Sequence, residues 1–141
     1  VLGDVPDYFD VMGFRVMVER RHNAKGALIT VSEATVKLSV DGREIMSVSE
    51  GNGPVNALDN ALRKDIGRFT PNIADLELVD FKVRMLDGGT GAVTRVLIES
   101  ADGQGRRWFT VGVSPNIVDA SFQALLDSIR FKLFNDGAKA P

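Results

Sequence analysis

An internal repeat constrains the fold of this chain more than any other feature of its sequence. Five apolar residues of the first half recur in the second half as the same residue types at one constant offset. They are Val55, Ala57, Ala61, Leu62 and Ile66, which recur as Val118, Ala120, Ala124, Leu125 and Ile129. Residues 13–16 (GFRV) likewise match residues 80–83 (DFKV). Identities at helical spacing indicate a duplicated structural unit.

The first half of the sequence reads as three strands and a helix. Residues 14–19, 34–40 and 44–49 alternate or are rich in β-branched side chains, and Asp41-Gly42 between the last two is typical of a two-residue hairpin turn. Apolar residues then follow at helical spacing from Val55 to Phe69, with Pro54 in the first turn. This order predicts a βββα unit.

The second half predicts the same order after a break at Thr70-Pro71-Asn72. Strands are expected at residues 75–86, 93–100 and 106–113, with Asp102-Gly103 in the second hairpin, and a helix at residues 115–133. We therefore predict an α+β fold: a duplicated βββα unit with pseudo-twofold symmetry, two antiparallel three-stranded sheets and two helices. The repeats are expected at about residues 9–70 and 73–134, within a single domain of 141 residues.

One helix cannot cover the whole apolar face of a three-stranded sheet, so the two units are expected to pack together. Six strands still leave edges and a face that need cover, and a second copy of the chain is the usual cover. The sequence thus predicts a homodimer.

Composition excludes several classes of protein. Apolar residues make up 44% and charged residues 26%, which is ordinary for a folded globular chain. The net charge is -2 and the basic residues are scattered, so the sequence predicts no nucleic-acid partner. No apolar run is long enough to span a membrane, so no membrane partner is predicted either. The absence of cysteine and of a targeting signal favours the cytoplasm. The missing initiator Met suggests a piece of a longer protein.

No residue pattern predicts a catalytic centre, a metal site or a cofactor. His22 is the single histidine and lies in a polar run that suggests an exposed strand end or loop. Acidic residues such as Asp41, Glu44 and Glu50 lack the spacing of a cation loop, and no serine lies in a nucleophile elbow. A free-standing enzyme is therefore the weakest of the possible functions.

The glycine-rich segment Gly51-Asn52-Gly53 before the first helix is the most informative candidate site. Its glycines permit close approach of the backbone, and the free amides of a helix start attract an anion such as a small carboxylate. The alternative is a tight structural connection in which Asn52 caps the helix. Nucleotide binding is not supported, because the third glycine of a dinucleotide fingerprint and the Lys-Ser/Thr of a P-loop are missing.

Five stretches of this sequence resemble the C-terminal domain of the 2-isopropylmalate synthase family, and are most similar to its citramalate synthase branch. They are GFRVMVERR at residues 13–21, SEATV at 32–36, EGNGPVNAL at 50–58, DFKVR at 80–84 and GVSPNIVDAS at 112–121. The resemblance extends from about Tyr8 to Leu133. It implies a duplicated, dimer-forming regulatory domain without catalytic residues, attached to a catalytic TIM barrel of the same polypeptide that this chain does not contain.

The resemblance also implies an effector site at the dimer interface that holds the pathway's end-product amino acid. The charged end of the effector would meet the glycine loop and the helix start, and its aliphatic end would meet residues of the second repeat. The implied residues are Gly51, Asn52, Gly53, Pro54, Val55, Asn56, Leu78, Phe81, Met85, Thr94, Ser114, Pro115 and Ile117. Many family members carry Tyr where this chain has Phe81. From the residues alone, core packing is the favoured explanation of Leu78, Phe81 and Met85.

Isoleucine is the expected effector if the parent enzyme makes citramalate, by condensing acetyl-CoA with pyruvate on the route to isoleucine. Leucine is the alternative if the parent is a 2-isopropylmalate synthase. The two amino acids differ in the position of one methyl group, which an apolar pocket distinguishes by only ~1–3 kcal/mol. A dimerisation module without any ligand is the remaining alternative.

Overall fold

The computed structural model describes residues 9–22, 24–85 and 93–137. The chain divides into two compact units between Thr70 and Pro71. We call residues 9–70 the N-terminal unit and residues 71–137 the C-terminal unit, and describe each separately.

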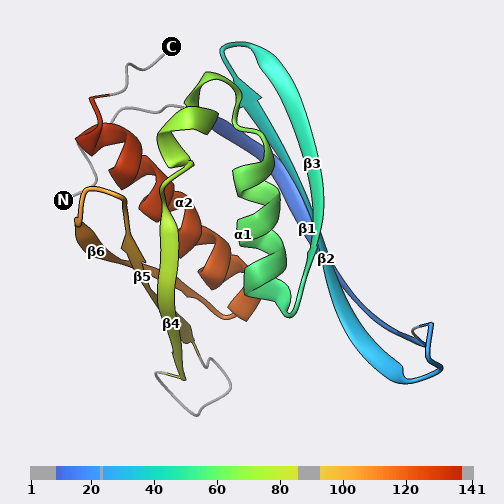
Figure 1. Ribbon diagram of the computed structural model, residues 1–141. Helices are drawn as coiled ribbons and strands as arrows, with labels where there is room; N and C mark the ends of the chain where they lie inside the picture. The colour runs from blue at the N-terminus through green and yellow to red at the C-terminus, as the bar shows by residue number, and fades with distance from the viewer. Residues whose placement is uncertain (1–8, 23, 86–92, 138–141) are drawn as a thin grey trace. The chain divides into compact units, whose positions relative to one another are not determined.

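The N-terminal unit is an antiparallel sheet in the order β1-β2-β3, followed by a helix. Its elements are β1 (Asp10–His22), β2 (Leu28–Val40), β3 (Arg43–Gly51) and α1 (Pro54–Lys64), shown in Figure 1. Asp41 and Gly42 join β2 to β3 with φ angles of 53° and 78°. Positive φ at both positions is what the predicted two-residue hairpin turn requires, so that prediction is confirmed.

The helix α1 lies on one face of β2 and β3. Alternate residues of β2, from Ala34 to Val40, are buried on this face. Ala57, Leu58, Ala61 and Leu62 of α1 are at most 1% exposed. The period of two in the strand and the spacing of three and four in the helix therefore meet in one apolar layer.

The sequence predicts one helix with an apolar stripe from Val55 to Phe69. The last part of that prediction is wrong, because the stripe continues beyond the end of α1. The helix ends at Lys64, Asp65 is extended, and a 3-10 helix, η2, follows at Gly67–Ile73. Gly67 has a φ of 66° and donates its N–H to the Asp65 carboxylate at 2.9 Å. Ile66, in the link between the two helices, and Phe69, in the 3-10 helix, are both buried although they lie outside α1.

The C-terminal unit repeats this order. It contains β4 (Glu77–Met85), β5 (Thr94–Ala101), β6 (Arg107–Ser114) and α2 (Ile117–Asn135), with the antiparallel sheet order β4-β5-β6. Leu86, predicted to end the first of these strands, lies outside the described residues. Asp102-Gly103 begins a turn that is longer than the Asp41-Gly42 turn. Gly105, with a φ of 83°, closes this longer turn by donating its N–H to the carbonyl oxygen of Asp102.

The helix α2 covers β5 and β6 and leaves much of β4 open. Val96 and Ile98 of β5 are 0% exposed. Their cross-strand neighbours on β4, Val83 and Phe81, are 42% and 43% exposed. Directly paired residues of antiparallel strands share a face, so β4 extends the apolar face of the sheet past the helix.

The predicted α+β fold with a duplicated βββα arrangement is confirmed. Each unit has one three-stranded antiparallel sheet and one following helix. In the part of the chain that the structure describes, neither α1 nor α2 meets the length and apolar character needed to span a membrane.

Candidate effector site

The glycine loop connects β3 directly to α1. Gly51 is the last residue of β3, Gly53 is the N-cap of α1, and Pro54 is its first residue. A Cβ atom on Gly51 would lie 2.5 Å from the backbone nitrogen of Ala57 and 2.8 Å from the carbonyl carbon of Asn56. No residue with a side chain fits at Gly51, because both atoms belong to the backbone of the helix that the loop must approach.

Gly53 differs from Gly51, since no atom lies within 4 Å of a Cβ built on it and its φ of -160° suits any residue. Because Gly53 has no side chain, α1 starts without a side-chain cap in the part of the chain that the structure describes. Asn52, the alternative cap, is exposed and does not serve as one. Among the described residues, the N–H groups of Val55 and Asn56 therefore have no N-cap side chain as acceptor.

The start of α2 shows what is missing at α1. Asn116 is its N-cap, and the Asn116 side-chain oxygen accepts hydrogen bonds from the N–H groups of Val118 and Asp119 at 2.8 and 3.2 Å. At the offset that aligns the repeats, Asn116 corresponds to Gly53. The same two helix amides are thus capped in the C-terminal unit and uncapped in the N-terminal unit.

Two hydrogen bonds hold α1 against β3 and so position the loop. The Asn60 side-chain amide donates to the carbonyl oxygen of Glu50 at 3.0 Å, and the Lys64 ammonium donates to the carbonyl oxygen of Val48 at 2.8 Å. These bonds tie the second half and the end of α1 to β3.

A hollow of about 480 Å³ opens beside the glycine loop. Its walls are the N-terminal part of β2 and the end of β3, formed by Ile29, Thr30, Val31, Glu50, Gly51 and Asn52. The three residues of β2 were not among the site residues expected from the sequence. The run of β-branched side chains there predicts a strand but gives no sign that it borders the loop.

In the C-terminal unit, three of the expected residues form one row across the sheet. Met85 pairs with Thr94, and Thr94 pairs with Ser114. The Thr94 hydroxyl donates to the Met85 sulfur at 3.4 Å. Phe81 lies on the same face farther along β4, with Val83 between it and Met85. Val83 was missed, although the alternation from Phe81 to Met85 places it on this face.

Phe81 and Met85 are not core residues, because they are 43% and 61% exposed. The core-packing alternative is therefore wrong for these two side chains. Leu78 is half-buried and pairs with Ser100, at roughly 20 Å from Met85 along the strand. The structure does not bring Leu78 into the row with Met85.

Ser114, Pro115 and Ile117 surround the start of α2. The Ser114 hydroxyl accepts the N–H of Asn116 at 3.2 Å, and the Ile117 side chain is 46% exposed. Ser114 therefore supports the residue that caps α2. This loop differs from the glycine loop, because its polar groups are already used within the unit.

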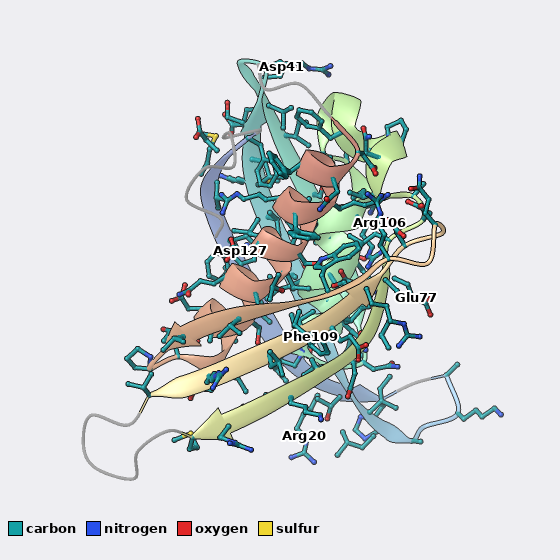
Figure 2. All side chains as sticks on the ribbon, turned by 90° about the vertical axis from the view of Figure 1, so that its left-hand side faces the viewer. Arg20, Asp41, Glu77, Arg106, Phe109 and Asp127 are labelled. Atoms are coloured by element: carbon teal, nitrogen blue, oxygen red, sulfur yellow. The ribbon has the colours of Figure 1, made fainter. Side chains whose placement is uncertain are left out.

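A buried charge cluster lies at the other end of α2. Lys132 is 2% exposed, and its ammonium lies 3.2 Å from Asp75, 3.4 Å from Asp102 and 2.9 Å from Asp136. Arg106, labelled in Figure 2, bridges Asp102 and Asp136 at 2.6 Å each. These five residues join the chain before β4, the β5–β6 turn and the end of α2.

The electrostatics of the cluster favour its ionised forms. Burial acts to raise the pKa of Asp102, but hydrogen bonds from Arg106, Gln104 and Lys132 outweigh it and lower that pKa to about 2. Burial likewise acts to lower the pKa of Lys132, and the bonds to Asp136 and Asp75 reverse this and raise it. The cluster is internally satisfied and holds α2 to the loops beside it.

His22 ends β1 and is exposed, as predicted. Within residues 9–22, 24–85 and 93–137, no group of three or more His, Cys, Asp or Glu side chains could hold a metal ion.

The family model described as the LeuA allosteric (dimerisation) domain matches residues 1–133. This chain belongs to that family. The resemblance seen in the sequence is therefore confirmed, and the uncapped helix start and the open face of β4 belong to a LeuA allosteric (dimerisation) domain.

Named relatives carry this domain within longer chains. The (R)-citramalate synthase of Geobacter sulfurreducens is 53% identical over 134 residues, covering 94% of this chain and 25% of that protein. The (R)-citramalate synthase of Aquifex aeolicus is 51% identical over 136 residues, covering 95% and 25%. The 2-isopropylmalate synthase of Pseudoalteromonas atlantica is 35% identical over 96 residues, covering 68% and 17%. The chain spans about a quarter of the length of the first two relatives.

Proposed function

We propose that this chain is the feedback regulatory domain of an (R)-citramalate synthase and that it binds isoleucine as a homodimer. The observation that carries the proposal is the uncapped start of α1, which follows a glycine loop that borders a hollow. The names of the relatives and the family's description as an allosteric domain support it.

The carboxylate of the amino acid is proposed to accept hydrogen bonds from the N–H groups of Val55 and Asn56. One of its oxygens would then do for α1 what the Asn116 side chain does for α2. An anion is favoured at this position, because the positive end of the helix dipole contributes ~0.3–1 kcal/mol in addition to the hydrogen bonds. The interaction needs no cofactor.

The remaining groups of the amino acid can be assigned in the same way. Glu50 is the charged residue that lines the hollow, and its carboxylate suits the ammonium group. The aliphatic side chain is proposed to contact the open face of β4 of a second copy, at Phe81, Val83 and Met85. These apolar side chains are partly exposed and so have surface left to bury.

In the whole enzyme, binding is proposed to change the catalytic activity of a barrel on the same polypeptide. Coupling between two such sites is typically ~1–3 kcal/mol. Deleting residues 51–141 from the full-length enzyme is expected to leave activity but abolish inhibition by isoleucine. Inhibition that survives this deletion would contradict the proposal.

Exchange of the two helix caps tests the site most directly. Gly53→Asn gives α1 the side-chain cap that α2 has, and isothermal titration is expected to show at least tenfold weaker binding of isoleucine. The physical reason is competition for the N–H groups of Val55 and Asn56. The matched control is Asn116→Gly, which uncaps α2, costs ~1 kcal/mol or less of stability, and leaves isoleucine binding unchanged.

Leucine titrated under the same conditions discriminates the alternatives. A preference for leucine would assign the chain to a 2-isopropylmalate synthase. Binding of neither amino acid by a dimeric native chain would favour a dimerisation module without a ligand. That alternative also predicts that Gly51→Asp alters assembly and does not alter inhibition.

A further inference from the structure

The hairpin of β1 and β2 extends past the rest of its own sheet. β3 pairs with β2 only as far as Ser32, which faces Gly51, whereas β1 follows β2 to the pair of His22 and Leu28. Figure 1 shows this two-stranded arm extending beyond β3 and α1. Among the described residues, Leu28–Val31 therefore has a strand on one side and none on the other.

The exposed edge of this arm has the composition of a strand that is normally paired. Its sequence is Leu28-Ile29-Thr30-Val31, which carries no charge and no proline and contains three consecutive β-branched residues. Leu28 is 52% exposed. An uncharged, β-branched edge invites pairing with another strand, and proteins usually protect such edges with charges.

The neighbouring strand shows this protection. The segment of β1 that faces these residues contains Glu19 and Arg20, and Arg20 is visible in Figure 2. Charged side chains are thus present on the β1 side of the arm and absent on the β2 side. A two-stranded ribbon is also at best marginally stable alone, so the arm gains stability from an additional strand.

The open edge is continuous with the proposed effector site. Ile29, Thr30 and Val31 form one wall of the hollow of about 480 Å³, and Glu50, Gly51 and Asn52 form the other. A strand added to the edge would border this hollow next to the glycine loop. The segment fits a second copy of itself, because antiparallel pairing of one segment with its own copy has the twofold symmetry of a dimer.

We propose that Leu28–Val31 is a dimerisation strand that pairs antiparallel with the same segment of a second copy. The partner's strand then forms part of the wall around the glycine loop and completes the effector site. This inference rests on the proposed homodimer. Full overlap places Ile29 opposite Thr30 of the partner subunit, so each dimer has two such contacts.

Charge exchange on this strand tests the inference. The lysine variant Ile29→Lys/Thr30→Lys and the glutamate variant Ile29→Glu/Thr30→Glu each place like charges opposite one another. Each variant alone is expected to dimerise at least about tenfold more weakly than the native chain in sedimentation analysis. An equimolar mixture of the two is expected to restore a dimer, because opposite charges then face each other.

The matched control is Met46→Lys/Val48→Lys, which adds the same charge to exposed positions of β3 away from the arm. It is expected to dimerise like the native chain. Circular dichroism shows whether each variant is folded, and restoration in the mixture excludes misfolding as the cause of dissociation. Hydrogen exchange adds a direct readout, since protection of the amides of Leu28–Val31 is expected to rise with protein concentration.

The inference is overturned if the lysine and glutamate variants dimerise as tightly as the native chain. It is also overturned if mixing the two variants does not restore the dimer. A native chain that is monomeric both with and without isoleucine would instead contradict the homodimer in the proposed function. The mass of the native chain therefore tests the proposed function, and the variants test the dimerisation strand.

Discussion

The two units of this protein begin their helices in opposite ways. At α2 the side chain of Asn116 satisfies the helix amides, whereas at α1 Gly53 has no side chain to offer and the corresponding amides have no side-chain cap. One copy of the helix start in the repeat therefore has a side-chain cap, and the other copy has none. Duplication allows this, because one unit can change its chemistry while the other preserves the fold.

The ends of the helices differ as well. α2 ends in the buried charge cluster around Lys132, and at the offset that aligns the repeats Lys132 corresponds to the buried apolar Phe69. In the N-terminal unit the chain leaves the α-helix at Lys64 and enters a 3-10 turn. The C-terminal unit is therefore held by charges at the place where the N-terminal unit is held by packing.

The largest effect on stability is expected from Lys132→Met. The substitution keeps the apolar stem but leaves three carboxylates around a site without its ammonium group, at a cost of ~3–5 kcal/mol. Urea unfolding of the 141-residue chain measures it. The control is Arg107→Met, which removes an ion pair of a 64% exposed side chain with Glu99 and should cost less than ~1 kcal/mol. Equal costs for the two variants would show that the cluster contributes no special stability.

A smaller effect is expected from alanine at the close-approach glycines. Gly51→Ala places a Cβ against the backbone of Ala57, and Gly112→Ala places one against the carbonyl oxygen of Ala120. Each is expected to destabilise its unit by ~1–3 kcal/mol, because backbone atoms must move. Gly53→Ala is the matched control, since no atom lies within 4 Å of its Cβ. Thermal unfolding compares the three, and a Gly53→Ala variant as unstable as Gly51→Ala would refute the steric explanation.

The smallest effects are expected in the change of the free energy of unfolding at acid pH, where Asp102 and Asp59 should act in opposite directions. The pKa of Asp102 is lowered to about 2 from a usual value of about 3.9. Its contribution is therefore present above about pH 4 and is lost as the pH falls toward 2, because the unfolded chain binds the proton first.

Burial raises the pKa of Asp59 despite its contact with Arg63 at 3.0 Å. The contribution of Asp59 is therefore present at low pH and is lost as the pH rises through its raised pKa. Asp102→Asn should flatten the loss of stability below pH 4. Asp59→Asn should steepen the loss of stability at higher pH, between the usual carboxyl pKa and the raised pKa of Asp59. Unfolding curves between pH 2 and pH 6 measure both, and slopes that change in the same direction would contradict this assignment.

Several features of the fold were predictable because they depend on local sequence. The Asp41-Gly42 turn, the strand alternation and the helical spacing each follow from interactions between residues close in the chain. The end of α1 was not predictable from apolar spacing, because Ile66 and Phe69 are buried although both lie beyond the end of the α-helix. The glycine loop was found as a candidate because its composition is unusual for a helix start.

The amino-acid sequence by itself thus determined the duplication, the order of the elements and the family to which the chain belongs. The tertiary structure alone decided that Asn116 closes α2 while α1 stays open, that Phe81 and Met85 are exposed, and that Lys132 lies buried among carboxylates. It also decided that β2 extends past the end of β3 beside the glycine loop. The physical reason is that capping, exposure and charge pairing depend on which segments meet in space, and residues distant in the sequence determine those meetings.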